Sequence, residues 1–240
     1  MNKIKIAFIG AGSYGFTFKL VADILSYEML ENCDFAFMDV NCERLDNLKI
    51  ILDEYFRMIE YKKEVKYTLN LDEALDGANF IINLVKIGFL EASQMDMNAA
   101  KKYGLHQTIG DTSGLAGVFR GLRTMIYDIT LCNKIEKISA PGAIVINYTN
   151  PQSMLVMAAS LTTSVPFIGL CHSVQGTTRQ IAKYLDIPYE ELTYDAAGIN
   201  HLSWVTKLER NGQDLYPMLR DLVNKRGIYD DLGTGLGTTR

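Results

Sequence analysis

A glycine-rich segment near the N-terminus constrains the fold more than any other feature of the sequence. The β-branched and aromatic run Ile4–Ile9 is typical of a buried parallel strand, and residues 10–15 follow it with GxGxxG spacing. A helical pattern over Phe16–Leu30 and a second strand pattern over Cys33–Val40 come next. This order predicts a βαβ unit of the kind that binds a dinucleotide.

Each residue of this unit has a predicted role. Gly10 makes the tight turn, Gly12 lets the backbone approach a pyrophosphate, and Gly15 permits close packing of helix against strand. Asp39 ends the second strand and would accept a hydrogen bond from a ribose hydroxyl, and its charge repels a 2′-phosphate. The motif therefore favours NAD over NADP, with a purely structural glycine turn as the alternative.

The alternation of apolar strands and helices continues to about residue 170 and then changes. After Cys171 a strand pattern over Ser203–Arg210 is turned by an Asn-Gly pair. We predict an α/β protein in which residues 1–170 form a Rossmann-like NAD-binding domain with a doubly wound, mostly parallel sheet. Residues 171–240 would begin a second, α+β substrate- and metal-binding domain, and the Gly- and Thr-rich tail from Asp230 indicates an interrupted chain.

Charge and composition exclude several classes of function. The 24 basic and 28 acidic residues give a net charge of −4 without a basic run, so neither nucleic acid nor a membrane surface is an expected partner. No apolar stretch approaches the roughly 20 residues of a membrane span, and no signal-peptide pattern is found. The four cysteines form no CxxC pair, which predicts reduced thiols and a cytoplasmic protein.

A second group of residues combines thiol and imidazole side chains. Cys171 and His172 follow the predicted strand that ends near Leu170, and His201 follows about thirty residues later. Ligands bind at the carboxyl end of parallel strands, so this thiol and imidazole would converge on a metal there. A buried structural cysteine and a hydrogen-bonded structural histidine are the alternative.

Two polar segments complete the candidate site. Residues 110–114 (GDTSG) are predicted to form a loop before a long helix over Leu122–Ile138, and residues 147–152 follow an apolar strand. At the edge of the sheet, Asp111 and Asn150 would present a carboxylate and an amide to a polyhydroxylated ligand. Asn150 alternatively serves only as a turn former or helix cap before proline.

Taken in order, these motifs resemble glycoside hydrolase family 4, the NAD- and metal-dependent glycosidases that do not use the usual pair of carboxylates. The resemblance covers the whole chain. It rests on five motifs: GAGS at 10–13, GDTSG at 110–114, TNP at 149–151, CHSV at 171–174 and GINH at 198–201.

The resemblance implies the following cofactor sites. Ser13 joins the glycines of the motif and Asp39 in binding NAD, and Asn150 helps to orient the nicotinamide. Cys171 and His201 hold a divalent ion, usually Mn²⁺ in this family, against two sugar hydroxyls. Ligand chemistry alone does not select manganese, because a thiolate favours softer metals.

The resemblance also implies a reaction and its residues. A hydride leaves C3 of the sugar, a base removes the C2 proton, the glycosidic oxygen is eliminated, water adds, and the hydride returns. His172 would protonate the leaving oxygen, Asn150 would bind sugar hydroxyls, and Asp111 would contact the substrate or take part in proton transfer. An NAD-binding module without turnover is the main alternative. A hydroxy-acid dehydrogenase is a weaker one, because this sequence shows no arginine–histidine pair of the kind that such enzymes use to bind a carboxylate substrate.

Two details bear on substrate and completeness. CHSV resembles the version of its motif in α-galactosidases, and Ser93 aligns with an arginine of phosphosugar members, so the expected substrate is a non-phosphorylated α-galactoside or related α-glycoside. Members of the family are roughly twice as long. The tyrosine base is therefore expected beyond residue 240, and the full-length protein is expected to be a homo-oligomer.

Overall fold

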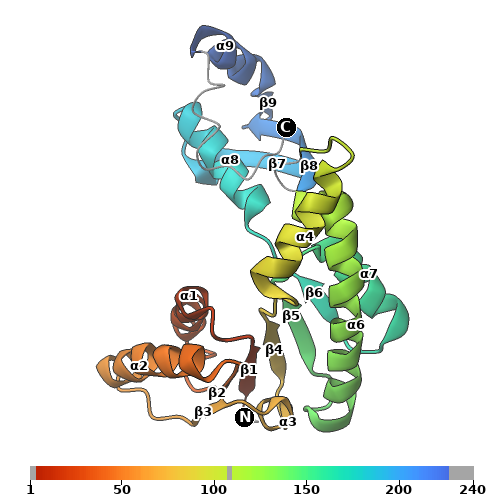
Figure 1. Cartoon of the computed structure of the whole chain (residues 1–240). Coiled ribbons are helices and arrows are strands. Elements are labelled where there is room, and N and C mark those ends of the chain that lie inside the picture. The colour runs from red at the N-terminus through yellow and green to blue at the C-terminus, as the bar shows by residue number, and fades with distance from the viewer. Residues whose placement is uncertain (1–3, 107–109, 227–240) are drawn as a thin grey trace. The chain divides into compact units, whose positions relative to one another are not determined.

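The computed structural model describes residues 4–106 and 110–226, which fall into two compact units (Figure 1). Among the described residues, the first unit joins 4–93 with 120–170, and the second joins 94–106 and 110–119 with 171–226. Helices α4 (Phe89–Lys101) and α6 (Leu115–Ile138) contribute residues to both units. None of the helices in the described ranges is both long and apolar enough to cross a bilayer.

The first unit is built on a six-stranded sheet in the order β3-β2-β1-β4-β5-β6, in which every neighbouring pair is parallel. This confirms the predicted Rossmann-like, doubly wound architecture. The strand order reverses between β1 and β4, and ligands of such sheets bind outside the carboxyl ends of the strands at this point. The strands are β1 (Lys5–Ile9), β2 (Asp34–Met38), β3 (Val65–Thr68), β4 (Phe80–Asn83), β5 (Ile144–Asn147) and β6 (Phe167–Gly169).

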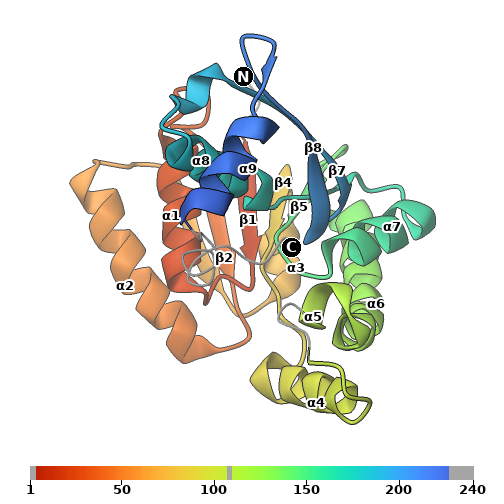
Figure 2. The ribbon, with the colours of Figure 1, turned by 90° about the horizontal axis from the view of Figure 1, so that it is seen from above.

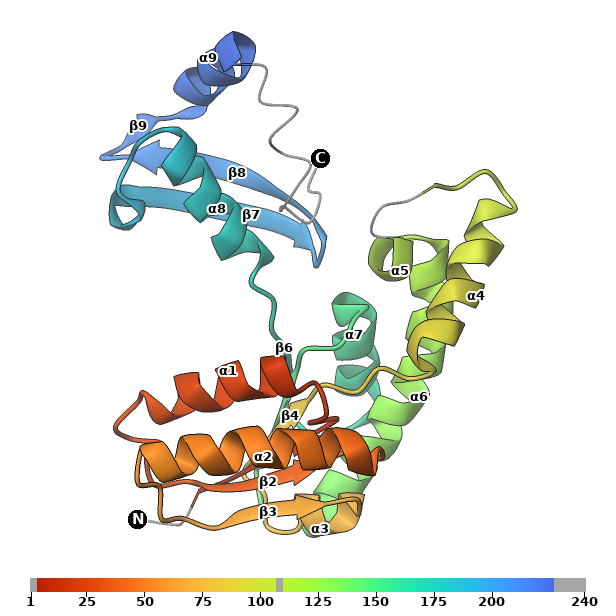
Figure 3. The same cartoon turned by 60° about the vertical axis from the view of Figure 1, so that its left-hand side comes forward.

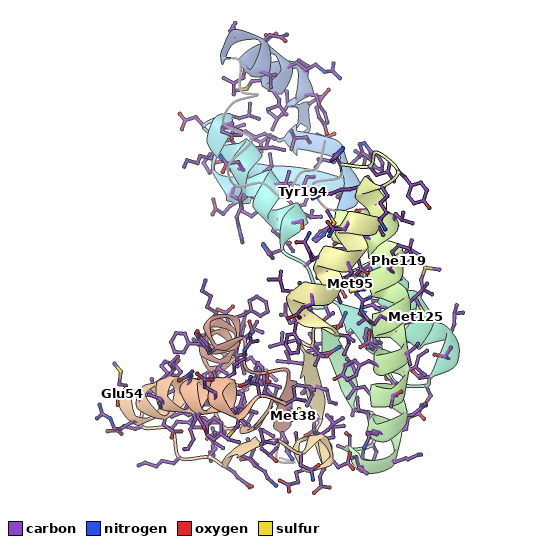
Figure 4. All side chains as sticks on the ribbon, viewed as in Figure 1. Met38, Glu54, Met95, Phe119, Met125 and Tyr194 are labelled. Atoms are coloured by element: carbon purple, nitrogen blue, oxygen red, sulfur yellow. The ribbon has the colours of Figure 1, made fainter. Side chains whose placement is uncertain are left out.

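Helices cover both faces of this sheet because successive strand residues point in opposite directions. Ile6 and Phe8 pack with one group of helices, whereas Ala7 packs with the other. Met38 lies in the second of these cores, while Glu54 points outward from its helix (Figure 4). The first group contains α1 (Tyr14–Leu25) and α2 (Cys42–Met58), which lie side by side in Figure 2, and the second contains α3 (Leu71–Leu75), α6 and α7 (Gln152–Thr162).

The second unit contains a three-stranded antiparallel sheet in the order β7-β8-β9, which confirms the expected start of an α+β region. Helix α8 packs against β7 around a small apolar core (Figure 3). Ala182, Leu192 and Leu208 lie at its centre. The elements are α5 (Gly110–Ser113), α8 (Ser173–Tyr184), the 3₁₀ turn η1 (Tyr189–Glu191), β7 (Leu192–Ile199), β8 (Leu202–Arg210), β9 (Gln213–Asp214) and α9 (Tyr216–Arg226).

Local structure differs from the prediction around the GDTSG motif. Residues 110–113 form the short helix α5 instead of a loop, and the long helix begins at Leu115 instead of Leu122. Gly117 lowers the apparent helical propensity of this stretch. A glycine is needed at this position because a Cβ on residue 117 would stand 2.4 Å from the carbonyl oxygen of Thr112. The tail from Asp230 lies outside the described residues.

Candidate functional site

The glycine motif forms a tight turn between β1 and α1. Gly10 has φ +81°, in the left-handed region that favours glycine, and a Cβ there would stand 3.0 Å from the backbone of Leu84. The N–H groups of Gly10 and Ala11 both donate to the carbonyl of Met38 at 2.9 Å. Thr17 Oγ1 donates to the carbonyl of Ala11 at 2.8 Å. The turn is therefore tied to β2 and to α1, with a fixed backbone in front of the helix N-terminus.

Asp39 closes the other side of this turn. Its Oδ2 accepts the N–H of Gly12 at 2.7 Å, and its Oδ1 accepts the N–H of Asn41 at 2.9 Å. A Cβ on Gly12 would stand 2.6 Å from Asp39 Oδ2 and 2.8 Å from Cβ of Arg44. Asp39 and Arg44 therefore already require a glycine at position 12, whether or not a pyrophosphate approaches the backbone there.

The role predicted for Gly15 is wrong. A Cβ on Gly15 would find no heavy atom within 4 Å, so this glycine does not serve close packing of helix against strand. Gly15 and Ser13 are exposed at the start of α1. The open space at Gly15 lies at the N-terminus of α1, where backbone N–H groups are able to bind phosphate.

Cys171 and His201 meet within the second unit. The Sγ atom of Cys171 lies 3.6 Å from Nε2 of His201, although the residues are thirty positions apart. His201 occupies the turn between β7 and β8 with φ +63°, and Ser173 Oγ lies 2.8 Å from the same Sγ. This turn brings the imidazole to the thiol.

The thiol of Cys171 and the imidazole of His201 fit a divalent ion that they would bind together, with its other coordination positions filled by further ligands. A thiolate and an imidazole are both metal-binding groups, and Sγ and Nε2 lie close enough together for one ion to bind both. The described residues contain no cluster of three or more His, Cys, Asp and Glu side chains that would form a closed site. Two protein ligands would leave coordination positions for substrate hydroxyls or water.

The other predicted site residues occupy several elements. His172 is exposed directly before α8, where its side chain makes no capping hydrogen bond. Asp111 lies in α5, and its side chain falls outside what the structure describes. Asn150 follows β5 in the first unit, is half-buried, and directs no hydrogen bond of its side chain to a described residue. It therefore does not act as the side-chain cap of α7, which Pro151 precedes.

A buried polar network below Asn150 was not predicted. Asn83 Nδ2 donates to Asn147 Oδ1 at 2.9 Å, and Asn147 Nδ2 donates to Gln152 Oε1 at 2.6 Å. Gln152 Nε2 donates to the carbonyls of Asn147 and Leu170, at 3.0 Å and 2.8 Å. The network joins the ends of β4, β5 and β6. One signal was available, because two apolar strands each end in asparagine.

Comparison with known proteins decides the family. The model of the family 4 glycosyl hydrolases matches residues 5–187, more than half of the chain. The chain belongs to this family. The C-terminal domain of the family 4 glycosyl hydrolases also matches residues 196–235. The predicted family is confirmed.

Relatives of this family 4 chain include two groups of glycosidases. An α-galactosidase of Rhizobium meliloti (strain 1021) is 40% identical over 213 residues, which are 89% of this chain and 44% of the relative. An α-galacturonidase of Thermoanaerobacter italicus is 33% identical over 96% of this chain and 51% of the relative. The chain thus spans about half the length of the curated relatives it matches.

A solved structure in the same family has the same fold. The 6-phospho-β-glucosidase of Thermotoga maritima, crystallised with manganese, NAD⁺ and glucose-6-phosphate, superimposes with a TM-score of 0.79 at 26% identity. The match covers 95% of this chain and 54% of that one. Cofactor-bound relatives therefore share the architecture on which the glycine turn and the Cys171 site lie.

Proposed function

We propose that this family 4 chain takes part in the hydrolysis of α-galactosides, or related α-glycosides, with NAD and Mn²⁺ as cofactors. The observation that carries the proposal is the 3.6 Å approach of Cys171 Sγ to His201 Nε2 within the CHSV and GINH motifs. The second support is the turn of residues 10–15, in which Gly12 donates its N–H to Asp39 and the space around Gly15 is open. The identity to α-galactosidases favours a galactoside as the substrate.

The residues assigned to the cofactors follow from this geometry. The turn of residues 10–15, with Ser13, would hold the pyrophosphate, and Asp39 would accept a ribose hydroxyl. Cys171 and His201 would hold the divalent ion. The chemistry supplied by the two groups when bound is reversible hydride removal at C3 of the sugar and Lewis-acid polarisation of its hydroxyls.

The remaining residues would act on the sugar itself. The amide of Asn150 offers two donors and one acceptor, which suits adjacent sugar hydroxyls and the nicotinamide carboxamide. His172, which is exposed, would donate a proton to the glycosidic oxygen as it leaves. Asp111 would contact the substrate or take part in proton transfer. Elimination followed by addition of water would give net hydrolysis.

The test is an assay of nitrophenyl α-galactoside with NAD and Mn²⁺ added singly and together, with the α-galacturonide and α-glucoside for comparison. Hydrolysis that requires both cofactors, and is fastest with the galactoside, supports the proposal. Exchange of the C2 hydrogen with D₂O reports proton abstraction separately from cleavage. The assay uses the full-length protein, because the base is expected beyond residue 240. NAD binding by that protein without either exchange or cleavage would overturn the proposal and favour a dinucleotide-binding module without turnover.

Assembly and location are part of the same proposal. We expect the full-length protein to be a cytoplasmic homo-oligomer, since NAD is an intracellular cofactor and the cysteines are unpaired in this structure. Light scattering of the purified protein and fractionation of its cells measure the two expectations. A monomer, or a protein recovered outside the cytoplasm, would contradict them.

A further inference from the structure

Arg44 lies beside the glycine turn, although no motif marks it. It occupies the first turn of α2, where its N–H donates to the capping side chain of Asn41 at 2.9 Å. Asn41 in turn donates its N–H to Asp39. The Cβ of Arg44 lies 2.8 Å from the position of a Cβ added to Gly12. Backbone N–H groups of Arg44, Asn41 and Gly12 thus donate to the side chains of Asn41 and Asp39, and these hydrogen bonds hold the segment together.

The guanidinium of Arg44 extends to an exposed aromatic ring. Its central carbon lies 5.6 Å from the ring centroid of Phe89, whose side chain is 48% exposed. Phe89 begins α4, after the loop that follows β4, with φ +46°. Within the described part of the chain, Arg44 has no ion pair with a carboxylate. A cation and a half-exposed ring therefore lie next to each other beyond the end of β2.

We propose that Arg44 and Phe89 form the binding surface for the adenine ring of NAD, with the guanidinium plane of Arg44 against the purine. The inference rests on the proposed use of NAD. Asp39 would hold the adenosine ribose, and the adenine is attached to that ribose by a single bond. Arg44 is the cation whose backbone is held near Asp39 by the hydrogen bonds through Asn41. Purine rings stack on planar guanidinium groups and on aromatic side chains.

Stacking of Arg44 on adenine and attraction of Arg44 to a phosphate of NAD predict different effects of substitution. Lysine in place of Arg44 would keep the charge but lose the planar surface, whereas tyrosine would keep a planar surface and lose the charge. Stacking therefore predicts that Arg44→Tyr binds NAD better than Arg44→Lys does. A phosphate contact predicts the opposite order.

The experiment is calorimetric titration of the chain with NAD, ADP-ribose, NADP and nicotinamide mononucleotide. Arg44→Ala should weaken NAD and ADP-ribose by a similar factor of about 3 to 30, the range of one cation–π contact. Binding of nicotinamide mononucleotide, which lacks adenine, should not change. Phe89→Leu should weaken the same two ligands.

The matched control is Lys49→Ala on the same helix. Lys49 also lies over an aromatic ring, 4.8 Å from the centroid of Tyr67, so this variant removes an equal charge and a similar contact. It should leave NAD affinity unchanged. Thermal unfolding of each variant checks that it is folded.

Three results would overturn the inference without touching the proposed cofactor. These are equal NAD affinity in wild type and Arg44→Ala, a loss of affinity confined to NADP, or better NAD binding by Arg44→Lys than by Arg44→Tyr. If the wild-type chain failed to bind NAD at all, the proposed function itself would fail. The two failures are thereby distinguished by the wild-type titration.

Discussion

The side-chain amide of Asn83 donates a hydrogen bond to Oδ1 of Asp128 at 3.0 Å, and both residues are almost completely buried. The other carboxylate oxygen of Asp128 has no hydrogen-bond partner among the described residues. Burial raises the pKa of Asp128 to about 7, while the bond from Asn83 acts in the opposite direction. Buried Asp128 therefore keeps its proton to a higher pH than a solvated aspartate does.

The first prediction concerns the pH dependence of stability. The pKa of Asp128 is higher in the folded than in the unfolded chain. Its contribution to the free energy of unfolding is therefore complete below about pH 4 and declines as pH rises towards 7. Over this range the free energy of unfolding of the wild type should fall by up to about 4 kcal/mol relative to that of Asp128→Asn. Urea unfolding of both proteins between pH 4 and 8 measures the difference.

Titratable groups near Asp128 do not produce the same pH dependence of the free energy of unfolding. Burial raises the pKa of Cys132 to about 11 and raises the pKa of Tyr127 as well, so both stay neutral over the range. Asp23→Asn on α1 is a suitable control, since Asp23 is exposed. A difference between wild type and Asp128→Asn that is constant with pH would show that Asp128 is ionised in the fold.

The second prediction concerns Gln152, which connects the ends of β5 and β6. A Cβ on Gly169 would stand 2.7 Å from the Gln152 side chain, so β6 is shaped to accommodate it. Gln152→Leu would leave the carbonyls of Asn147 and Leu170 without this donor, at a cost of about 2 kcal/mol. Urea unfolding tests this, with exposed Ser160→Ala on the same helix as control. Equal losses in the two variants would contradict the role assigned to Gln152.

The parallel sheet could be predicted because its determinants are local. Apolar strands alternate with amphipathic helices, and the turn between Ile9 and Tyr14 carries the glycines that its backbone requires. The pairing of Asn83 with Asp128 could not be predicted. The two residues are 45 positions apart, and their contact depends on how α6 lies against β4.

The site shows the same division. The thiol of Cys171 and the imidazole of His201 were expected to converge, because motif and strand order placed both at a strand end or turn. The packing role of Gly15 was wrong, since spacing within a motif does not show which neighbours a Cβ would meet. The position of Arg44 beside the turn could not be predicted from the sequence, because an arginine on the exposed side of a helix is ordinarily a solvated surface residue.

The third prediction concerns selection between NAD and NADP by Asp39. Asp39→Asn keeps the side-chain acceptor for one backbone N–H but removes the negative charge, so the turn should remain folded. The preference for NAD over NADP should shrink, because repulsion of the 2′-phosphate is lost. Calorimetry with both cofactors gives the ratio. Equal binding of NAD and NADP by the wild type would show that the assignment of Asp39 is wrong.

The last prediction concerns the metal. Cys171→Ser removes the thiolate that lies 3.6 Å from His201, and with it one of two proposed protein ligands, so Mn²⁺ binding should fall below detection in a spin-resonance titration. NAD affinity should stay nearly intact, because the glycine turn and Asp39 make their contacts within the first unit. Cys42→Ser is the matched control, as Cys42 is an exposed thiol on α2. An Mn²⁺ titration that is the same for Cys171→Ser and wild type would remove Cys171 from the proposed site.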